Sequence, residues 1–251
     1  ILYLISTISN YNMLTDPYVD IDTNLTTLMR VLEQCKDRDV TFNFISSWFV
    51  YGPAHSRHDE DATCNPNGFY SITKYAAEKL VKEYCTTFDI GYRILRLGNV
   101  YGGPDSGSNK RNALHFLINR LRENQDITVH INVSRDFIHI MDVCRALKLL
   151  CEQGHTNGIY NIGTGIATRL GTALDDAKTL VCSNGYVLRD NVPIDYNQAV
   201  CFALNCDKLK SHGFQPLIPF QEGLRDLCLH QKFCTPDLSL MGQKLMQRLL
   251  A

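Results

Sequence analysis

The stretch "TFNFISSWFVYG", residues 41–52, has the pattern of a short β-strand that ends in two serines, followed by large apolar residues and a glycine turn. In a parallel α/β sheet, ligands bind outside the carboxyl ends of the strands. If such a sheet is present, this strand brings Ser46 and Ser47 to the ligand-binding edge. The alternative is that both hydroxyls only satisfy backbone groups at the strand end.

Predicted strands and helices alternate on both sides of this stretch. Apolar strands are expected at residues 1–6, 41–45 and 92–97, and helices at 20–34 and 69–88. After residue 112 the expected elements are shorter and mixed, with strand-like "DITVH", "DFIHI" and "GIYNIG" between helical segments. The pattern predicts an α/β fold, a doubly wound parallel sheet with a smaller C-terminal α/β lobe. We expect the sheet domain at residues 1–112 and mainly the lobe, interleaved with the last strands of the sheet, at 113–251.

Composition excludes several classes of protein. The 251 residues are 45% apolar and 20% charged, which is typical of a globular chain with a sizeable core. A net charge of −1 with scattered Lys and Arg argues against nucleic acid as a partner. No apolar run is long enough for a membrane span, so we expect a soluble protein. The ten cysteines form no CxxC pair, which predicts no metal site and reduced thiols in the cytoplasm.

A second signal is "YSITK", in which Tyr70 and Lys74 are four residues apart near the start of the long helix. This spacing places both side chains on one helical face. An ammonium beside a phenol stabilises the phenolate and lowers the pKa of the phenol from its usual value near 10. Tyr70 is therefore a candidate base, although a Tyr and a Lys at this spacing also occur by chance.

Several motifs in order extend this pattern: Ser-Ser-x-x-Val-Tyr-Gly, Tyr-x-x-x-Lys, "RLGNVYGG", "SRDFIHIMDV", "IYNIGTG" and "DKLKSHGFQP". Together they resemble the extended short-chain dehydrogenase/reductase family, in its nucleotide-sugar epimerase/dehydratase branch. The resemblance implies a Rossmann-like doubly wound sheet with a substrate-binding C-terminal lobe. It also implies a homodimer formed through helices 20–34 and 69–88.

Residue roles follow from the same resemblance. It implies that Tyr70 is the catalytic base, that Lys74 lowers its pKa and holds the nicotinamide ribose, and that Ser47 bridges substrate and Tyr70. The implied cofactor is NAD, with NADP as the alternative, and the implied cofactor-binding residues are Leu4, Ile5, Ser6, Asn24, Ser46, Tyr70 and Lys74. The implied residues for the nucleotide-diphosphate sugar are Ser47, Asn99 and Arg135. Structural roles remain the alternative for three of these: Asn24 as a helix polar residue, Asn99 as a turn former and Arg135 as a surface ion pair.

The reaction depends on the two residues after Ser47. The 4,6-dehydratases of the family have a carboxylic pair there, whereas this chain has Trp48 and Phe49, which cannot transfer protons. We therefore expect an epimerase, usually a 4-epimerase, that acts by transient oxidation to a keto sugar. A nucleotide-keto-sugar reductase, a dehydratase and a catalytically inactive dimerising or binding remnant remain alternatives. Trp48 and Phe49 themselves could simply pack beneath the site.

The chain departs from the family pattern in two places. The family's strand and Gly-x-x-Gly-x-x-Gly turn, which cradles the cofactor pyrophosphate, have no match in this sequence. We expect that portion to precede Ile1. Relatives also have a Gly-rich hairpin where this chain continues directly from His130 to Arg135, so residues could be missing after His130.

Overall fold

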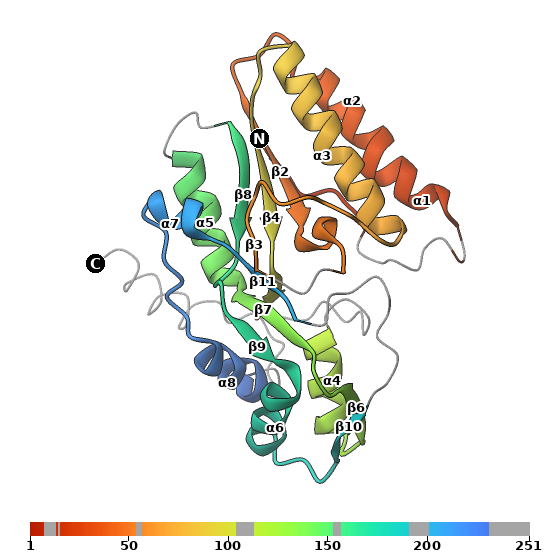
Figure 1. Ribbon diagram of the computed structural model, residues 1–251, viewed down its shortest axis with the longest axis vertical. Coiled ribbons are helices and arrows are strands. Elements are labelled where there is room, and N and C mark those ends of the chain that lie inside the picture. Colours follow the sequence, from red (N-terminus) through yellow and green to blue (C-terminus); the bar gives the residue numbers. More distant parts are fainter. Residues whose placement is uncertain are drawn as a thin grey trace.

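The computed structural model describes residues 1–7, 14, 16–53, 57–103, 113–152, 157–190 and 201–230. Its largest sheet has four parallel strands: β1 (Leu2–Tyr3), β2 (Thr41–Ser47), β4 (Gly91–Leu97) and β8 (Gly158–Ile162), in the order β1-β2-β4-β8 (Figure 1). The strand β8 comes from the second half of the chain, so both halves build this sheet. The expected domain boundary at residue 112 lies outside the described residues and stays a prediction.

Helices cover both faces of this sheet. Neighbouring residues of a strand point to opposite faces, and Ile94 and Leu95 accordingly belong to two different apolar cores. The first face carries α1 (Tyr18–Ile21), the π-helical turn η2 (Asp22–Thr26), α2 (Thr27–Glu33) and α3 (Phe69–Thr87). The second face carries α5 (Ile140–Glu152) and α7 (Asp207–Ser211) (Figure 1). The expectation of an α/β fold with a doubly wound parallel sheet is confirmed.

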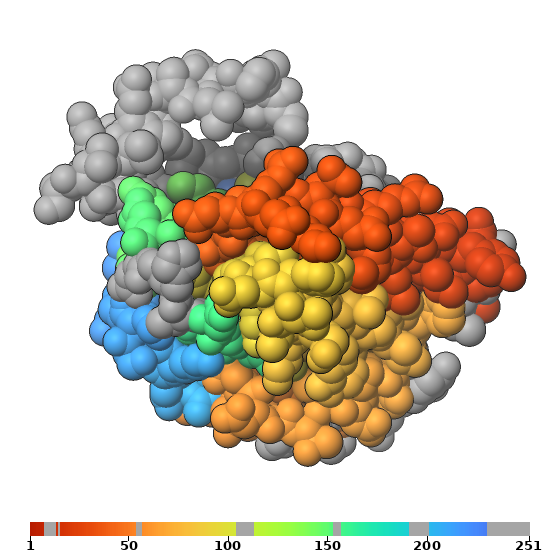
Figure 2. Space-filling view, turned by 90° about the horizontal axis from the view of Figure 1, so that it is seen from above, coloured from red at the N-terminus to blue at the C-terminus, as the bar shows by residue number. Residues whose placement is uncertain are grey.

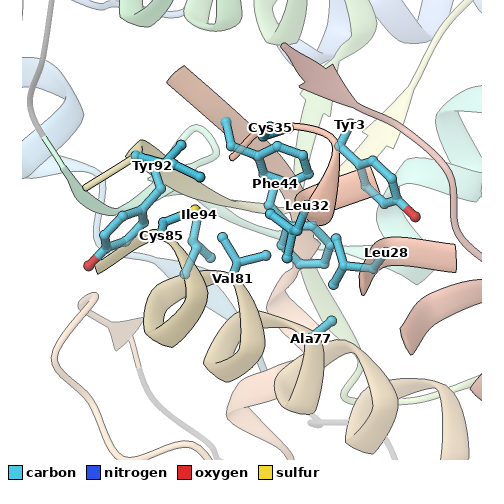
Figure 3. Packing of buried hydrophobic residues seen from close by; sticks show 12 residues of the cluster. Tyr3, Leu28, Leu32, Cys35, Phe44, Ala77, Val81, Cys85, Tyr92 and Ile94 are labelled. Atoms are coloured by element: carbon cyan, nitrogen blue, oxygen red, sulfur yellow. The ribbon is translucent and has the colours of Figure 1, made fainter. Parts of the chain in front are cut away.

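The core on the first face fixes α3 against the sheet. Figure 3 shows it, with Leu28 and Leu32 from α2 and Ala77, Val81 and Cys85 from α3. Residues four apart share one face of a helix, so each helix presents a continuous apolar strip. Full burial of one large apolar side chain contributes about 1.5–3 kcal/mol. This packing therefore sets the position of Tyr70 and Lys74, which lie in the first turns of α3.

Among the described residues, the smaller lobe contains short strands and three helices. A three-stranded sheet contains β5 (Asn99–Tyr101), β7 (Ser134–His139) and β9 (Ala167–Arg169). Two strand pairs accompany it: β6 (Ile127–His130) with β10 (Val187–Asp190), and β3 (Arg57–His58) with β11 (Ala203–Leu204). The helices are α4 (Ala113–Arg122), α6 (Leu170–Leu180) and α8 (Phe220–His230) (Figure 1).

Some expected boundaries differ from the structure. The strand expected at residues 1–6 is only the two-residue β1, which lies at the edge of the sheet and pairs with Asn43 and Phe44 of β2. The first helix begins at Tyr18, two residues earlier than expected. The sequence also did not predict β3, β5, β9, β10, β11 or α7, because elements this short carry little periodic pattern of their own.

Two further observations concern the location of the protein. Within the described residues, no helix combines the length and the apolar character needed to cross a membrane. The nine cysteines in the described ranges are all free thiols. A cytoplasmic location stays a prediction.

Candidate active site

Ser47 lies where β2 ends and the 3-10 turn η3 (Trp48–Tyr51) begins. Its hydroxyl oxygen accepts a hydrogen bond of 3.3 Å from the backbone N–H of Phe49 and so caps the turn. Gly52 follows the turn with a φ of 81°, and a Cβ there would lie 1.9 Å from the carbonyl oxygen of Asn65, so only glycine fits. The backbone-satisfying role that we kept as an alternative therefore holds for Ser47. Accepting this bond still leaves its own O–H to donate to another group.

Tyr70 lies in the first turn of α3, half-buried at the carboxyl ends of β1 and β2. Its hydroxyl group lies near enough to the side chains of Ser47 and Ser6 for both to act on its pKa. The ring of Phe49 contacts the ring of Tyr70 edge to face, with 6.2 Å between the centroids. Three hydroxyl groups thus meet at the edge of the sheet where a parallel α/β fold binds its ligands.

The acidity of Tyr70 differs from the expectation. Burial raises the pKa of Tyr70 to about 12; the neighbouring side chains of Ser47 and Ser6 act in the lowering direction, and the nearby charge of Asp20 raises it further. The expected lowering by Lys74 is not seen. The Lys74 ammonium instead donates to the carbonyl oxygen of Ile45 at 2.6 Å and lies 4.6 Å from the centroid of the Phe44 ring.

Lys74 is itself shifted toward its neutral form. Burial lowers the pKa of Lys74 to about 8, while the nearby carboxylate of Glu78 acts in the opposite direction. At pH 7 an amine with this pKa is still mostly protonated. Lys74 therefore remains a cation, one helical turn from Tyr70.

Asn24 holds three segments together. It is buried in the π-helical turn, and its Oδ1 accepts from the backbone N–H of Thr7 at 2.9 Å and from the Ser6 hydroxyl at 3.1 Å. Its Nδ2 donates to the hydroxyls of Thr7 at 2.8 Å and Thr73 at 3.0 Å. Both N–H donors and the carbonyl oxygen are thus used within the protein. The structure therefore supports a positioning role for Asn24, which joins the end of β1 to α3, rather than the direct cofactor contact that the resemblance implies.

Asp20 is a buried carboxylate that the sequence interpretation missed. Its side chain is 0% exposed and accepts a hydrogen bond from the hydroxyl of Thr7. Asp20 lies four residues before Asn24, and this spacing puts both side chains on the same helical face. That spacing is the signal that could have revealed it.

Ser46 does not point to the ligand-binding edge as expected. Its side chain is buried, and its hydroxyl donates to a carboxylate oxygen of Glu78 at 2.6 Å. Glu78 forms an ion pair with Arg96, with 2.7 Å between Oε2 and Nη2. The reason is the alternation of side chains along a strand, which turns Ser46 to one face when Ser47 faces the other. Ser46 is thus part of a buried polar network beneath the site.

Leu4, Ile5 and Ser6 follow β1 at its carboxyl end. The side chains of Leu4 and Ile5 are exposed, and Ser6 is partly buried next to Tyr70. This segment therefore offers an apolar surface and one hydroxyl beside the Tyr70 hydroxyl.

Asn99 and Arg135 lie on adjacent strands of the three-stranded sheet, β5 and β7. The Nδ2 of Asn99 is buried and has no hydrogen-bond partner among the described residues. Arg135 is only 6% exposed, and its Nη1 donates to the carbonyl oxygen of Ser134 at 2.9 Å. Burial lowers the pKa of Arg135 to about 10, so the guanidinium stays charged at neutral pH. The surface ion pair that we considered for Arg135 does not fit this buried position.

Asp136 fixes the strand that carries Arg135, and the sequence interpretation did not assign it a role. Its carboxylate accepts hydrogen bonds from the backbone N–H groups of Thr164, Gly165 and Leu204 at 2.8, 2.9 and 3.1 Å. It also accepts from the Thr164 hydroxyl at 2.6 Å. These bonds tie β7 to the loop after β8 and to β11.

Trp48 and Phe49 form a stacked pair, with 4.3 Å between ring centroids. Trp48 is 2% exposed and also stacks on Phe202 at 4.2 Å. Packing beneath the site, which we kept as an alternative, therefore describes Trp48, whereas the Phe49 ring reaches Tyr70. In the part of the chain that the structure describes, no group of three or more His, Cys, Asp or Glu could hold a metal ion.

The sequence and fold match known proteins. Residues 6–163 match the NAD dependent epimerase/dehydratase family. The chain is 30% identical to a "Putative UDP-glucose 4-epimerase" of Methanocaldococcus jannaschii over 219 residues, 85% of this chain and 70% of the relative. It is 26% identical to the dTDP-D-glucose 4,6-dehydratase of Mus musculus over 192 residues, 73% of this chain and 53% of the relative.

A solved structure shows the same architecture. The UDP-glucose 4-epimerase of Thermus thermophilus, in complex with NAD, superposes with a TM-score of 0.80 at 24% identity, covering 93% of this chain and 78% of that chain. These similarities, together with the hydroxyl groups gathered around Tyr70, confirm the resemblance to extended short-chain dehydrogenases/reductases. The chain belongs to the NAD dependent epimerase/dehydratase family.

Proposed function

We propose that this chain is a nucleotide-sugar 4-epimerase that oxidises its substrate transiently to a keto sugar. The observation that carries the proposal is the meeting of the hydroxyls of Ser47, Ser6 and Tyr70 at the carboxyl edge of the parallel sheet. The two residues after Ser47 are aromatic, so the turn supplies no carboxylate for elimination of water. The relative from Methanocaldococcus jannaschii, with its 4-epimerase description, supports the same reaction.

In this proposal Tyr70 accepts the proton of the sugar hydroxyl, and Ser47 donates a hydrogen bond that orients that hydroxyl. Bound NAD supplies the hydride acceptor and donor for the sugar carbon. The pKa of Tyr70, about 12 in the structure, has to fall for this role at neutral pH. A nearby positive charge lowers the pKa of a phenol. We assign this role to Lys74, which lies one turn along α3 from Tyr70.

The residues at the carboxyl end of β1 fit the nicotinamide half of NAD. Leu4 and Ile5 present apolar side chains, and the hydroxyls of Ser6 and Tyr70 lie side by side. We assign Lys74 and Tyr70 to the nicotinamide ribose. Asn24 contributes by holding Ser6 and Thr7 in place.

The nucleotide-diphosphate sugar extends from Tyr70 toward the smaller lobe in this proposal. The buried Nδ2 of Asn99 has a hydrogen bond to donate, and the Arg135 guanidinium suits the bidentate geometry of phosphate oxygens. Two adjacent strands thus present an amide and a guanidinium to the diphosphate.

A keto-sugar reductase would use the same Ser47, Tyr70 and Lys74 and differ in whether the cofactor is released. The dehydratase alternative has a relative in the mouse enzyme, but Trp48 and Phe49 disfavour it. The proximity of the Ser47 side chain to the Tyr70 hydroxyl disfavours an inactive remnant.

We also propose a homodimer formed through residues 20–34 and 69–88. Figures 1 and 2 show α2 and α3 side by side on one side of the molecule. Exposed apolar side chains on this layer include Val19, Ile21, Ile72 and Phe88. Sedimentation velocity would test the assembly, and a monomer at micromolar concentration would contradict it.

The proposed reaction is tested by assaying turnover of a UDP-hexose with NAD. Tyr70→Phe should reduce turnover at least about 100-fold and leave sugar-nucleotide affinity largely unchanged, because it removes only the proton acceptor. Arg135→Ala should weaken that affinity by about 2–3 kcal/mol. Tyr75→Phe, on the same helix, is the matched control and should behave like the wild type. Undiminished turnover of Tyr70→Phe would refute the assignment of the base.

A further inference from the structure

A buried carboxylate lies at one end of the polar cluster next to Tyr70. Asp20 is 0% exposed and belongs to α1, which packs against α3 (Figure 1). It accepts a hydrogen bond from the hydroxyl of Thr7, which is 8% exposed and follows the end of β1. Burial of a carboxylate costs free energy, and the proton transfer proposed above gives Asp20 no part.

This carboxylate fixes the direction of the hydrogen bonds around it. An ionised carboxylate is an acceptor only, so the single hydrogen of the Thr7 hydroxyl goes to Asp20. The Thr7 oxygen can then only accept, and it accepts from Nδ2 of Asn24 at 2.8 Å. The orientation of the Asn24 amide is thereby set. Its oxygen is left to accept from the backbone N–H of Thr7 at 2.9 Å and from the Ser6 hydroxyl at 3.1 Å.

The hydrogen bonds of Asn24 lead to Tyr70 along two routes. One route is through Ser6, whose side chain lies near the Tyr70 hydroxyl. The other is through Thr73: Nδ2 of Asn24 donates to its hydroxyl at 3.0 Å. The Thr73 hydroxyl in turn donates to the carbonyl oxygen of Tyr70 at 3.0 Å. Asn24 is therefore linked both to a neighbour of the phenol oxygen and to the backbone of Tyr70.

The π-helical turn η2 brings Asn24 into this position. The backbone N–H of Thr27 donates to the carbonyl oxygen of Asp22, five residues earlier, where an α-helix would use the residue four earlier. Asp20 and Asn24 are both buried, whereas residues 21–23 between them are exposed or half-buried. Single π-helical turns are rare and occur frequently at functional sites.

We propose that Asp20 is a positioning residue for Tyr70, which acts through Thr7 and Asn24 to fix the place of the phenol oxygen at the end of β1. This role rests on the proposed function, and Asp20 itself touches neither the sugar nor the cofactor. A general base has to lie within hydrogen-bond reach of the proton that it accepts. A misplacement of about 1 Å can lower the rate about 100-fold.

The first test compares Thr7→Val, which removes the hydroxyl, with Thr7→Ser, which keeps it. Turnover of a UDP-hexose with NAD is measured for each variant at the pH of its maximum rate, and circular dichroism checks that the protein is folded. Thr7→Val should lower kcat about 10- to 100-fold and change KM by less than about threefold. Thr7→Ser should recover most of kcat, because its hydroxyl can still donate to Asp20.

A double-mutant cycle ties this effect to the carboxylate. Asp20→Leu removes the acceptor and should lower kcat over the same range as Thr7→Val, and the double variant should be little slower than either single variant. Unchanged kcat in Thr7→Val, no recovery in Thr7→Ser, or additive losses in the double variant would each overturn the inference.

Thr27→Val is the matched control. Thr27 lies at the end of the same π-helical turn, and its hydroxyl donates to the carbonyl oxygen of Asp22 at 2.8 Å. This variant also removes a threonine hydroxyl, but one that belongs to neither route to Tyr70. Its kcat should equal that of the wild type, and a loss as large as that of Thr7→Val would overturn the inference.

A second readout needs neither substrate nor cofactor. In protein with ¹³C-labelled tyrosine, the Cζ signal of Tyr70 is assigned by its loss in Tyr70→Phe. The signal should move in Thr7→Val and in Asp20→Leu, return toward the wild-type position in Thr7→Ser, and stay in place in Thr27→Val. A Tyr70 signal that does not move in Thr7→Val would overturn the inference and leave the proposed function intact. A wild type that turns over no UDP-hexose would overturn the proposed function, whereas the Tyr70 signal would still report whether Asp20 positions this side chain.

Discussion

Replacement of Glu78 by Gln tests how much a buried ion pair next to the proposed active site contributes to the free energy of unfolding. The Glu78 carboxylate accepts from Arg96 Nη2 at 2.7 Å and Nε at 3.0 Å, and from the Ser46 hydroxyl at 2.6 Å. Both charged side chains are 2% exposed. The ion pair joins α3 to β4, and the hydrogen bond from Ser46 joins α3 to β2. Ser46 is the residue immediately before Ser47. Glu78→Gln keeps the shape of the side chain and removes its charge.

The magnitude follows from the burial of the pair. Removing one partner of a buried ion pair costs about 3–5 kcal/mol, because the remaining charge stays in a low-dielectric environment without its counter-charge. The Gln carbonyl oxygen can still accept two of the three hydrogen bonds, those from Ser46 and from Arg96 Nε, which both go to Oε1; this places the expected loss near the lower limit, about 3 kcal/mol. The Glu78 charge also raises the pKa of Lys74, so its removal should lower that pKa further.

The free energy of unfolding is measured by urea denaturation followed by circular dichroism. Glu152→Gln is the control, because it breaks the exposed Lys148–Glu152 pair, whose atoms are 3.8 Å apart and whose side chains are 70% and 63% exposed. It should cost less than about 0.5 kcal/mol. The double substitution Glu78→Leu with Arg96→Met should recover part of the loss, since no buried charge remains. If Glu78→Gln costs no more than Glu152→Gln, the reasoning about burial is wrong.

Three further predictions concern acidity and positioning. Asp20→Asn removes a charge that raises the pKa of Tyr70, so the rise of kcat with pH should move to lower pH; an unchanged profile would contradict this. Burial lowers the pKa of His58 below 6.5, so the folded state favours the neutral imidazole. Its contribution to stability should be full above pH 6.5 and should be lost as the pH falls through the folded-state pKa. Measurements of Tm against pH should show this loss, and His58→Phe should remove it. Asp136→Asn should lower the free energy of unfolding by about 2 kcal/mol or more in urea titrations, because it weakens hydrogen bonds to three backbone N–H groups.

The longer strands and helices could be predicted from the sequence alone. The apolar runs of β2, β4 and β8 are bounded by turn residues, and α3 has apolar residues at helical spacing. These are local patterns, and the structure reproduces their positions within one to three residues at most ends. The motif order around Ser47, Tyr70 and Arg135 also sufficed to identify the family.

The short elements could not be predicted. Strand β3 exists because Arg57 and His58 pair with Ala203 and Leu204, far along the chain, and β10 exists by pairing with β6. Two residues carry no periodicity of their own, so only tertiary contacts define them. The roles of the Asp20 and Asp136 carboxylates could not be predicted for the same reason. Both depend on burial and on hydrogen-bond donors from other segments of the chain.

The chemical groups at the site and the order of the longer strands and helices could be read from the amino-acid sequence, because spacing along one element is a local property. The direction in which those side chains point, and their acidity, depend on how distant segments pack together. The spacing of Tyr70 and Lys74 predicted an ammonium that lowers the pKa of the phenol, yet Lys74 donates to the Ile45 carbonyl and burial raises the pKa of Tyr70. Desolvation depends on every segment packed around a group, and no local pattern records it.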